Sequence, residues 1–400
     1  MWAKRPSERG RLGSCHNPVT RCRMSLRLGE IGPATCSDGR DQEMNLDSLM
    51  RNTGEWLRGT GPESDIVIST RIRLARNLTN YPFTNRATTT QKAEIEARLR
   101  DTLTRLDSNP RLQYVNVLAL NPLDRQMLVE RQLMSRALAN AEGPRGVAFD
   151  ERESVSVMIN EEDHLRLQVM RSGLALDDAW GEIDRLDDQI EALVNYAFHE
   201  QFGYLTACPT NVGTGMRASV MMHLPGIYQS KQLDKVVRSL QKINLVVRGL
   251  YGEGSRAFGE FYQISNQVTL GKSETQALTE IRDVILTTIQ WERKARAILL
   301  RDKRQQLQDH VARALGTLQS ATMMTSEETM ELLSVVRLGI HLQLMDDVKL
   351  TTPFVNELFL QTQPAHLQKL MGTTLDGEER NAARARYLRN RLRELGAGAV

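Results

Sequence analysis

Cysteine is scarce in this 400-residue chain, and most of it lies at one end. Three of the 4 cysteines (Cys15, Cys22 and Cys36) precede residue 44, which leaves Cys208 as the only cysteine beyond that point. The larger part of the chain therefore has no internal disulfide, which favours a reducing, cytoplasmic location. The spacing of the early cysteines matches no paired-cysteine zinc motif.

Long apolar runs and an excess of one charge are also lacking. No run approaches the roughly 18 apolar residues of a membrane helix, and the N-terminus lacks the apolar stretch of a secretory signal. The 52 Lys and Arg residues are balanced by 49 Asp and Glu, a net charge of +3. We therefore expect neither a membrane nor nucleic acid as a partner. An apolar content of 40% is enough for a large packed core.

The first 43 residues differ from the rest of the chain. They are rich in Arg, Gly, Ser and Pro, and have almost no periodic apolar pattern. Such a segment buries too little surface to offset its ordering entropy, so we predict a disordered leader over 1–43 and assign it no function. We expect a catalytic domain over 44–299 and a helical regulatory or dimerisation domain over 300–400.

Apolar periodicity predicts a mixture of helices and strands in the larger part. It favours helices over 44–58, 90–106 and 177–201, and almost continuous helix after Ser273. Alternation favours strands near 66–73, 114–120, 154–159 and 244–248, and a hairpin that joins 261–265 to 267–270. There is no regular βαβ period and no Gly-rich Rossmann or P-loop signature, so the fold class is α+β.

Two segments place side chains of like charge next to each other, which is electrostatically unfavourable. In the segment 69–73, Arg71 and Arg73 share one side of a strand, where two guanidinium groups repel unless an anion lies between them. In the segment 160–166, three consecutive acids, Glu161, Glu162 and Asp163, directly follow a strand, which is expensive unless they meet cations.

Two later loops add more arginines and carboxylates. Residues 208–219 join Cys208 to a Gly-containing loop and Arg217, and residues 248–254 bring Arg248 and Glu253. Each feature also has an ordinary structural interpretation: an isolated Arg-x-Arg is a solvated strand edge, an acid run is a solvated turn, and a lone cysteine is a small core residue. His164 beside the acids is better explained as a structural histidine than as a catalyst.

Taken together and in this order, the segments resemble the ATP:guanido phosphotransferase (phosphagen kinase) family over about Gly61 to Leu270. The resemblance is carried by Ser-Thr-Arg-Ile-Arg, Asn-Glu-Glu-Asp-His, Cys-Pro-Thr-Asn-Val-Gly-Thr and Arg-Gly-Leu-Tyr-Gly-Glu. Within this family the chain is most similar to the bacterial protein-arginine kinases, and its tail extends the match to about residue 395. The resemblance implies a mostly antiparallel sheet flanked by helices and an all-helical C-terminal domain.

The resemblance also implies a nucleotide site, with ATP and Mg²⁺ as cofactors. Guanidinium forks suit the neutralisation of a triphosphate. Mg²⁺ would bridge the phosphate oxygens. It would have no direct protein ligand and would be held to the protein largely through water, with help from Glu161 and Asp163. The implied ATP-binding residues are Ser69, Thr70, Arg71, Ile72, Arg73, Gln132, Arg166, Arg217, Ala218, Ser219, Val220, Met221, Arg248, Gly249, Leu250, Tyr251 and Gly252. Gln132 stands where the family has a histidine.

The catalytic roles fall to three residues by the same resemblance. A guanidinium has a pKa above about 12 and is a poor nucleophile until it loses a proton. Glu162 and Glu253 would grip it, and one of them would accept that proton as the N–P bond forms. Cys208 matches the family's reactive cysteine and would help to orient the acceptor.

The length of the chain before Ser69 bears on the acceptor. Small-substrate relatives carry a helical domain of roughly a hundred residues there, and the 25 residues 44–68 that precede Ser69 are too few for one. We therefore expect the acceptor to be an arginine residue in a protein. The alternatives are a kinase of free arginine or another small guanidino compound, and a non-catalytic adaptor that binds phosphoarginine.

The tail contains a candidate regulatory site. Arg380, Asn381, Arg384 and Ala385 match a family motif that is implied to bind phosphoarginine, with Asn381 in place of an aspartate. A solvated basic helix is the alternative. The resemblance further implies protein substrates with exposed arginines that are marked for stress-response proteolysis, a zinc-finger activator protein, a Clp-type unfoldase, and a homodimer formed through the tail.

Overall fold

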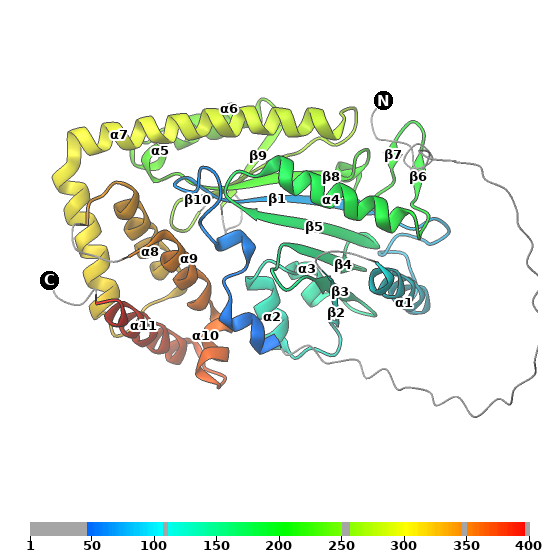
Figure 1. Ribbon diagram of the computed structural model, residues 1–400, viewed down its shortest axis with the longest axis horizontal. Coiled ribbons are helices and arrows are strands. Elements are labelled where there is room, and N and C mark those ends of the chain that lie inside the picture. The colour runs from blue at the N-terminus through cyan, green and yellow to red at the C-terminus, as the bar shows by residue number, and fades with distance from the viewer. Residues whose placement is uncertain (1–45, 107–110, 250–256, 346–349, 397–400) are drawn as a thin grey trace, which may run out of the picture.

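The computed structural model describes residues 46–106, 111–249, 257–345 and 350–396. An eight-stranded sheet lies at its centre, in the order β2-β3-β4-β5-β1-β8-β10-β9, and every neighbouring pair is antiparallel (Figure 1). The strands are β1 (Val67–Arg76), β2 (Gln113–Asn116), β3 (Gly146–Phe149), β4 (Val155–Ile159), β5 (Leu165–Ser172), β8 (Met216–His223), β9 (Leu245–Gly249) and β10 (Phe261–Asn266). A separate two-stranded sheet pairs β6 (Phe198–His199) with β7 (Gly203–Tyr204).

Helices flank the sheet, and they form nearly all of the described chain after residue 273. They are α1 (Thr89–Arg105), α2 (Pro122–Glu130), α3 (Arg136–Asn140), α4 (Leu176–Glu191), α5 (Pro225–Gln229), α6 (Leu233–Gln241), α7 (Glu274–Ser320), α8 (Ser326–His341), α9 (Thr352–Gln361), α10 (Pro364–Met371) and α11 (Gly377–Glu394). Short 3₁₀ turns lie at Leu46–Arg51, Glu55–Leu57 and Pro209–Asn211. The expected α+β fold, with an antiparallel sheet and a helical C-terminal region, is confirmed.

One face of the sheet forms the main core. Alternate residues of β1, such as Ile72 and Leu74, point to this face, and the facing residues Val169 and Ala218 extend it across β5 and β8. Helices α4 and α7 cover it, as Figure 1 shows above the sheet. The period of two along each strand leaves the other set of side chains for the opposite face.

Among the described residues, helices cover the opposite face at its two ends. Helices α2 and α3 pack on the β2–β4 end through an apolar cluster that includes Met127, Val147 and Met158. Helices α8 and α9 and the turn at Glu55–Leu57 pack on the other end through a cluster that includes Ile68 and Phe261. The strip between these clusters carries most of the arginines that the sequence analysis singled out.

Several expected elements are wrong in extent or pairing. The helix over 177–201 ends at Glu191, and its last part contains β6. Residues 267–270 form no strand, because β10 pairs with β8 and β9 instead. The expected helix over 44–58 is two 3₁₀ turns, and the strand expected at 114–120 ends at Asn116. Helix α7 continues through residue 300 and bends at Lys303, where φ is −137°. Among the described residues, no helix is long and apolar enough to cross a membrane.

Candidate active site

A polar row crosses the face of the sheet opposite the main core. Ser69, Arg71 and Arg73 of β1 lie directly opposite Met221, Ser219 and Arg217 of β8, respectively. On the other side of β1, Gln168 of β5 pairs with Arg73, and Arg166 pairs with Ala75. Because directly paired residues share a face, the antiparallel register brings together arginines that are up to about 150 residues apart in the chain.

Amide side chains hold Arg71 in place. Its Nη1 donates to Gln132 Oε1 at 3.1 Å and its Nη2 donates to Gln263 Oε1 at 2.7 Å. Neither partner carries a charge, so the guanidinium is fixed without being neutralised. Burial, followed by repulsion from Arg217 and Arg166, lowers the pKa of Arg71 to about 10.

Arg73 and Arg217 have fewer of their hydrogen-bond donors paired than Arg71. Burial lowers the pKa of Arg73 well below its ordinary value, and repulsion from Arg71, Arg166 and Arg217 adds to this effect. Burial also lowers the pKa of Arg217, with Arg248 and Arg166 as further causes. The Nε atoms of both Arg73 and Arg217 are buried without a hydrogen-bond partner. Such an excess of positive charge with unused donors is the electrostatic description of an anion site.

The acidic turn between β4 and β5 is held by its polar side chains. Asn160 has a φ of +58°, a left-handed conformation that asparagine tolerates, and its Nδ2 donates to the carbonyls of Lys92 and Pro144. His164 is fully buried: its Nδ1 accepts from the backbone N–H of Leu78, and its Nε2 lies 2.9 Å from the carbonyl of Pro82. The expectation that His164 is a structural residue is confirmed.

The fixed turn presents Glu161 and Glu162 to an arginine. Glu161 Oε1 accepts from Arg166 Nη1 at 2.7 Å and from the Ser135 hydroxyl. Glu162 Oε2 accepts from Arg166 Nη2 at 3.1 Å, but the Glu162 side chain remains 45% exposed. Glu162 therefore has free carboxylate capacity at the edge of the arginine row.

Asp163 connects the acidic turn to the cysteine loop. Its Oδ1 accepts from Asn77 Nδ2 and from the backbone N–H of Ala207, both at 2.7 Å, and the residue is fully buried. The next residue is Cys208, whose Sγ lies 3.0 Å from Thr210 Oγ1. The electrostatic interaction of Cys208 with Arg217 places the thiol beside the same row. Asp163 thus positions the loop, a role that the sequence analysis missed.

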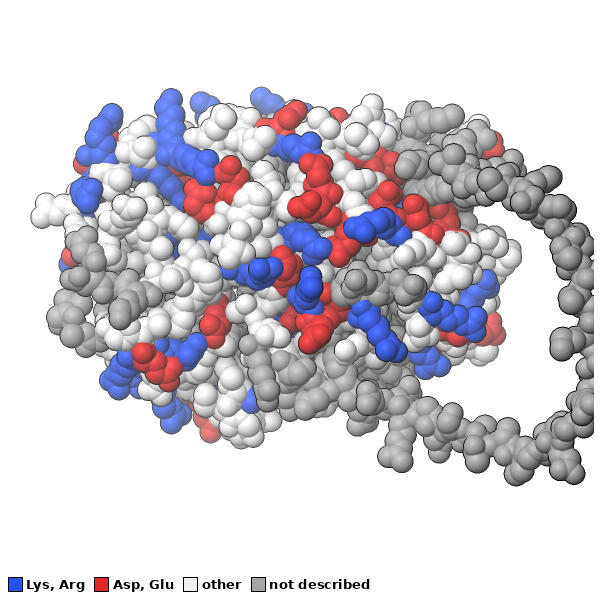
Figure 2. All heavy atoms as spheres, in the orientation of Figure 1, with Lys and Arg blue, Asp and Glu red and all other residues white. Residues whose placement is uncertain are grey.

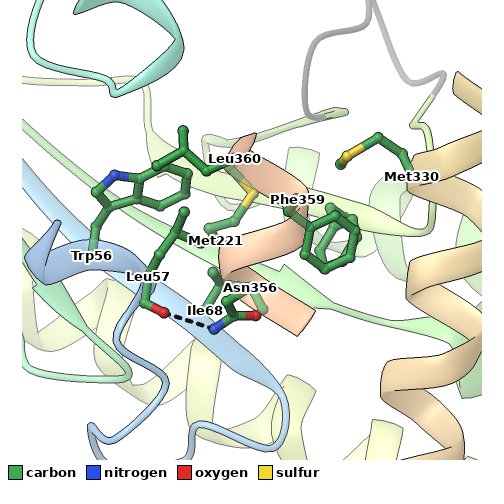
Figure 3. Close-up of a pocket in the computed structure, with 9 residues that line it drawn as sticks. Trp56, Leu57, Ile68, Met221, Met330, Asn356, Phe359 and Leu360 are labelled. Atoms are coloured by element: carbon green, nitrogen blue, oxygen red, sulfur yellow. Dashed lines mark hydrogen bonds between the residues drawn. The ribbon is translucent and has the colours of Figure 1, made fainter. Parts of the chain in front are cut away.

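Two pockets open along the row and a third adjoins it. Arg217 and Arg248 line a polar pocket of about 410 Å³ together with Thr210 and Asn266. A second pocket, of about 270 Å³, is lined by Trp56, Ser69, Arg71, Gln132, Met170, Ser219, Met221 and Gln263. Trp56 and Met221 also wall an apolar pocket of about 390 Å³, where they meet Phe359 and Leu360 of α9 (Figure 3). The arginine row therefore has an apolar border on the side of the C-terminal helices.

Comparisons with known proteins agree with this geometry. Residues 94–295 match the ATP:guanido phosphotransferase C-terminal catalytic domain, and residues 304–399 match the protein-arginine kinase McsB C-terminal domain. The protein-arginine kinase of Halothermothrix orenii is 44% identical over 86% of this chain and 98% of its own. That of Brevibacillus brevis is also 44% identical, over 88% and 98% of the two chains.

The chain belongs to the protein-arginine kinase family. It is therefore an ATP:guanido phosphotransferase that uses ATP.

Solved phosphagen kinase structures share the fold. The duplicated taurocyamine kinase from Schistosoma mansoni, with bound transition state analog components, has a TM-score of 0.54 and 28% identity. The match covers 59% of this kinase and only 34% of that chain. Lombricine kinase has a TM-score of 0.53 and 25% identity, over 62% of this kinase and 71% of that chain.

Not every residue expected to bind ATP turns its side chain toward the row. Thr70, Ile72, Ala218 and Val220 are fully buried and point to the core face. Thr70 is used there in a bond from its hydroxyl to the carbonyl of Gly173. Four of the predicted site residues, Leu250, Tyr251, Gly252 and Glu253, lie outside the residues that the structure describes. Gly249 ends β9, and Arg248 is exposed.

The sequence predicted Gln132 but not the other two glutamines of this kinase's site, Gln168 and Gln263. Gln263 binds Arg71, and Gln168 donates to the Gln132 carbonyl at 2.6 Å. Both glutamines alternate with apolar residues on strands, which predicts only the face of the strand on which each one lies. Which residues they meet depends on the order of strands in the sheet, which this alternation does not give.

The tail residues lie together on α11. Arg384 is buried, and it donates to the carbonyls of Thr362 and Met324 and to Asn381 Oδ1. Arg380 donates to the carbonyl of Leu375, and Ala385 belongs to the apolar cluster beneath. Figure 2 shows basic side chains gathered at the end of the molecule where α11 lies.

Proposed function

We propose that this chain transfers the terminal phosphoryl group of ATP to the guanidinium group of arginine residues in proteins. The names of its relatives support this activity. The observation that carries the proposal is the row of like-charged guanidinium groups. Burial, followed by repulsion from other arginines of the row, lowers the pKa values of Arg71, Arg73 and Arg217. The folded protein without a ligand contains this unfavourable repulsion, and the negative charge of a bound triphosphate would relieve it.

The row would act on the nucleotide by neutralisation and alignment. Arg71 is fixed by two amides, whereas Arg73 and Arg217 keep unused buried donors that can turn to phosphate oxygens. In the transfer, the bond between the terminal phosphorus and the bridging oxygen breaks, and ADP leaves with that electron pair. Guanidinium forks stabilise the charge that develops on this oxygen.

The acceptor would approach from the side of Glu162. Its exposed carboxylate beside Arg166 can bind an incoming guanidinium and accept its proton as the nitrogen–phosphorus bond forms. We propose that Glu253 provides the second carboxylate and that Cys208 helps to orient the acceptor. Because Glu162 is 45% exposed, a side chain on the surface of another protein can reach it.

Mg²⁺ would belong to the bound nucleotide. Among the described residues, no three acidic, histidine or cysteine side chains form a cluster that could hold a metal ion. Asp163 is committed to Asn77 and Ala207, so of the two acids expected to help the ion through water only Glu161 is retained in this proposal. We propose that the phosphate oxygens hold the ion, which would supply further neutralisation of negative charge.

The test is a phosphorylation assay with two acceptors in parallel. With ATP labelled on its terminal phosphate, we expect acid-labile label on an arginine-rich protein and far less on free arginine. Glu162→Gln should lower the rate by at least about a hundredfold, since it removes an acid–base group. Exclusive labelling of free arginine would favour a small-molecule kinase, and an equal rate with Glu162→Gln would contradict the role of Glu162. An adaptor would label neither acceptor.

Further proposals rest on the family alone. We propose that the chain works in the cytoplasm, where ATP is available and Cys208 stays reduced. The marking of proteins for stress-response proteolysis by a Clp-type unfoldase, a zinc-finger activator, a homodimer, and phosphoarginine binding at Arg380, Asn381, Arg384 and Ala385 belong to the same proposal. The catalytic and regulatory domains would meet near residue 300, close to the bend of α7 at Lys303.

A further inference from the structure

A buried network of charged side chains joins the end of α2 to the start of α10. Glu130 accepts from the backbone N–H groups of Ala365 and His366, at 2.9 and 3.1 Å, and its Oε2 lies 2.7 Å from His366 Nδ1. Arg131 donates from its Nε to Glu153 Oε2 at 2.8 Å and from its Nη2 to the carbonyl of Asn52 at 2.6 Å. All four ionisable side chains are almost fully buried.

The network fixes the tautomer of His366. Glu130 Oε2 can only accept, so His366 Nδ1 must carry the hydrogen. His366 Nε2 is then free to accept from Arg131 Nη1, which lies 3.2 Å away. Burial lowers the pKa of His366 despite the neighbouring Glu130, in agreement with a neutral ring. Each nitrogen of this histidine therefore has one partner, and the two partners are adjacent residues of one turn.

Arg131 directly precedes Gln132, which lines the pocket of Arg71 and Ser219 that we assign to the nucleotide. Gln132 has a φ of +62°, a conformation that a glutamine rarely adopts and that the surroundings must enforce. Its side chain accepts from Arg71 and its carbonyl accepts from Gln168. The anchoring of Arg131 on one side and of Gln168 on the other holds this backbone conformation.

A second contact places the C-terminal helices beside two residues that line this pocket, Trp56 and Met221. Asn356 of α9 donates to the carbonyl of Leu57 at 2.9 Å, and Phe359 and Leu360 lie near Trp56 and Met221 (Figure 3). Helices α9 and α10 are consecutive, so one unit of the C-terminal region contacts both Arg131, the residue before Gln132, and the neighbours of Trp56 and Met221, which line the pocket.

We propose that Arg131 and His366 are positioning residues of the nucleotide site, and that through them the C-terminal region sets the orientation of Gln132 and Arg71. This inference rests on the proposed function. Neither residue touches the nucleotide. Their effect is on the affinity for nucleotide, because Arg71 is aligned before a phosphate arrives.

Two substitutions at His366 separate the parts of the network. His366→Gln places a carbonyl oxygen near the former Nε2 and can still accept from Arg131. His366→Asn places an amide near the former Nδ1, so it keeps the donor to Glu130 but loses the contact with Arg131. We expect the Kd for ADP, measured by calorimetry, to rise about tenfold in His366→Asn and less than about threefold in His366→Gln.

A third variant controls for the docking of the two helices. Lys369 of α10 forms an ion pair with Asp124 of α2, with 2.5 Å between Nζ and Oδ1. This pair also joins α10 to α2, but the buried network of Arg131 and His366 includes neither residue. Lys369→Gln should therefore leave the Kd for ADP unchanged. If His366→Asn fails to fold, Glu153→Gln gives a second weakening of the Arg131 anchor and should also raise the Kd.

The outcomes separate a failure of the proposed function from a failure of this inference alone. If the wild-type protein does not bind ADP or ATP, the proposed function fails and this inference fails with it. If the wild type binds and all variants bind equally well, only the inference is overturned. An equal loss in Lys369→Gln would also overturn it, since general helix docking would then explain the effect. In kinetic assays we expect the KM for ATP to change more than kcat.

Discussion

At the scale of single residues, two arginines on one strand show the difference between a binding group and a structural one. Arg76 is buried with Asp187, to which its Nη2 donates at 2.7 Å, and it lies 3.6 Å from the ring centre of Tyr204. Burial lowers its pKa, but the interactions with Asp187, Tyr204 and Tyr196 together outweigh that effect and the pKa is raised. Arg73 lies three residues earlier, and its pKa is lowered. Only Arg73 has charge to offer to a ligand.

The first prediction follows from that contrast. Arg73→Met removes one of several repelling cations, so we expect the free energy of unfolding without nucleotide to rise by about 1 kcal/mol. The Kd for ATP should rise at least about tenfold, because a phosphate loses a charged partner. Thermal unfolding with and without ATP measures both effects at once.

Arg76→Met is the matched control on the same strand. It leaves Asp187 buried without its main cationic partner, so we expect a loss of about 3 kcal/mol or more in stability. Destabilisation by both substitutions to a similar degree would contradict the view that Arg73 is held in a repulsive environment.

Which residues form the site could be predicted only in part from the sequence. Alternation along β1 and the family motifs indicated Arg71, Arg73, Arg166 and Arg217, since their spacing is local. Gln263 and the structural role of Asp163 were missed because their partners, Arg71 and Ala207, are set by strand order and by loop packing. Local spacing carries no information about either.

At the scale of elements, the docking of α11 depends on a few polar contacts to the starts and ends of other helices. The backbone N–H of Met324, just before α8, donates to the carbonyl of Asn381, and Arg384 donates to the carbonyl of Met324. Burial, followed by repulsion from Arg380, lowers the pKa of Arg384 to about 10. Asn381 offers Arg384 only a neutral oxygen, at 2.9 Å.

Asn381→Asp is therefore expected to stabilise the helix in its place. A carboxylate at 2.9 Å from a poorly compensated guanidinium makes a charge-assisted hydrogen bond, and we expect about 1 kcal/mol of added stability in urea unfolding. Asn390→Asp is the control on the same helix, because Asn390 is exposed and near the C-terminal end, where a negative charge is unfavourable. An equal gain from both changes would show that the effect is not due to Arg384.

Most long helices were predictable, and the errors have physical causes. Capping signals mark the starts of α1 at Thr88 and of α7 at Ser273, where both capping boxes are formed. The helix pattern of α4 was extended too far, because the apolar residues after Glu191 continue its spacing although they lead into β6. The hairpin at 267–270 was wrong because β10 lies between two other strands, which sequence spacing does not reveal.

At the scale of the whole molecule, three histidines with lowered pKa values lie where the C-terminal helices make contacts. His223 at the end of β8 bonds to Ser334 of α8, with 2.8 Å between Nε2 and Oγ, and burial lowers its pKa well below the usual value. Burial, followed by repulsion from Arg337 and Arg296, lowers the pKa of His341 to about 4. Together with His366, these groups resist protonation in the folded state.

The last prediction is a loss of stability in mild acid. The unfolded chain takes up a proton at each histidine as the pH falls through about 6.5, whereas the folded protein does not take one up at His341 until about pH 4. The contribution is fully present above about pH 7 and is lost progressively below it, so His341 alone should account for about 2 kcal/mol between about pH 7.5 and pH 5. His341→Gln should reduce this pH dependence of the free energy of unfolding by that amount. His310→Gln, at an exposed position of α7, should leave it unchanged. A profile that stays equally steep in His341→Gln would assign the acid sensitivity to other groups.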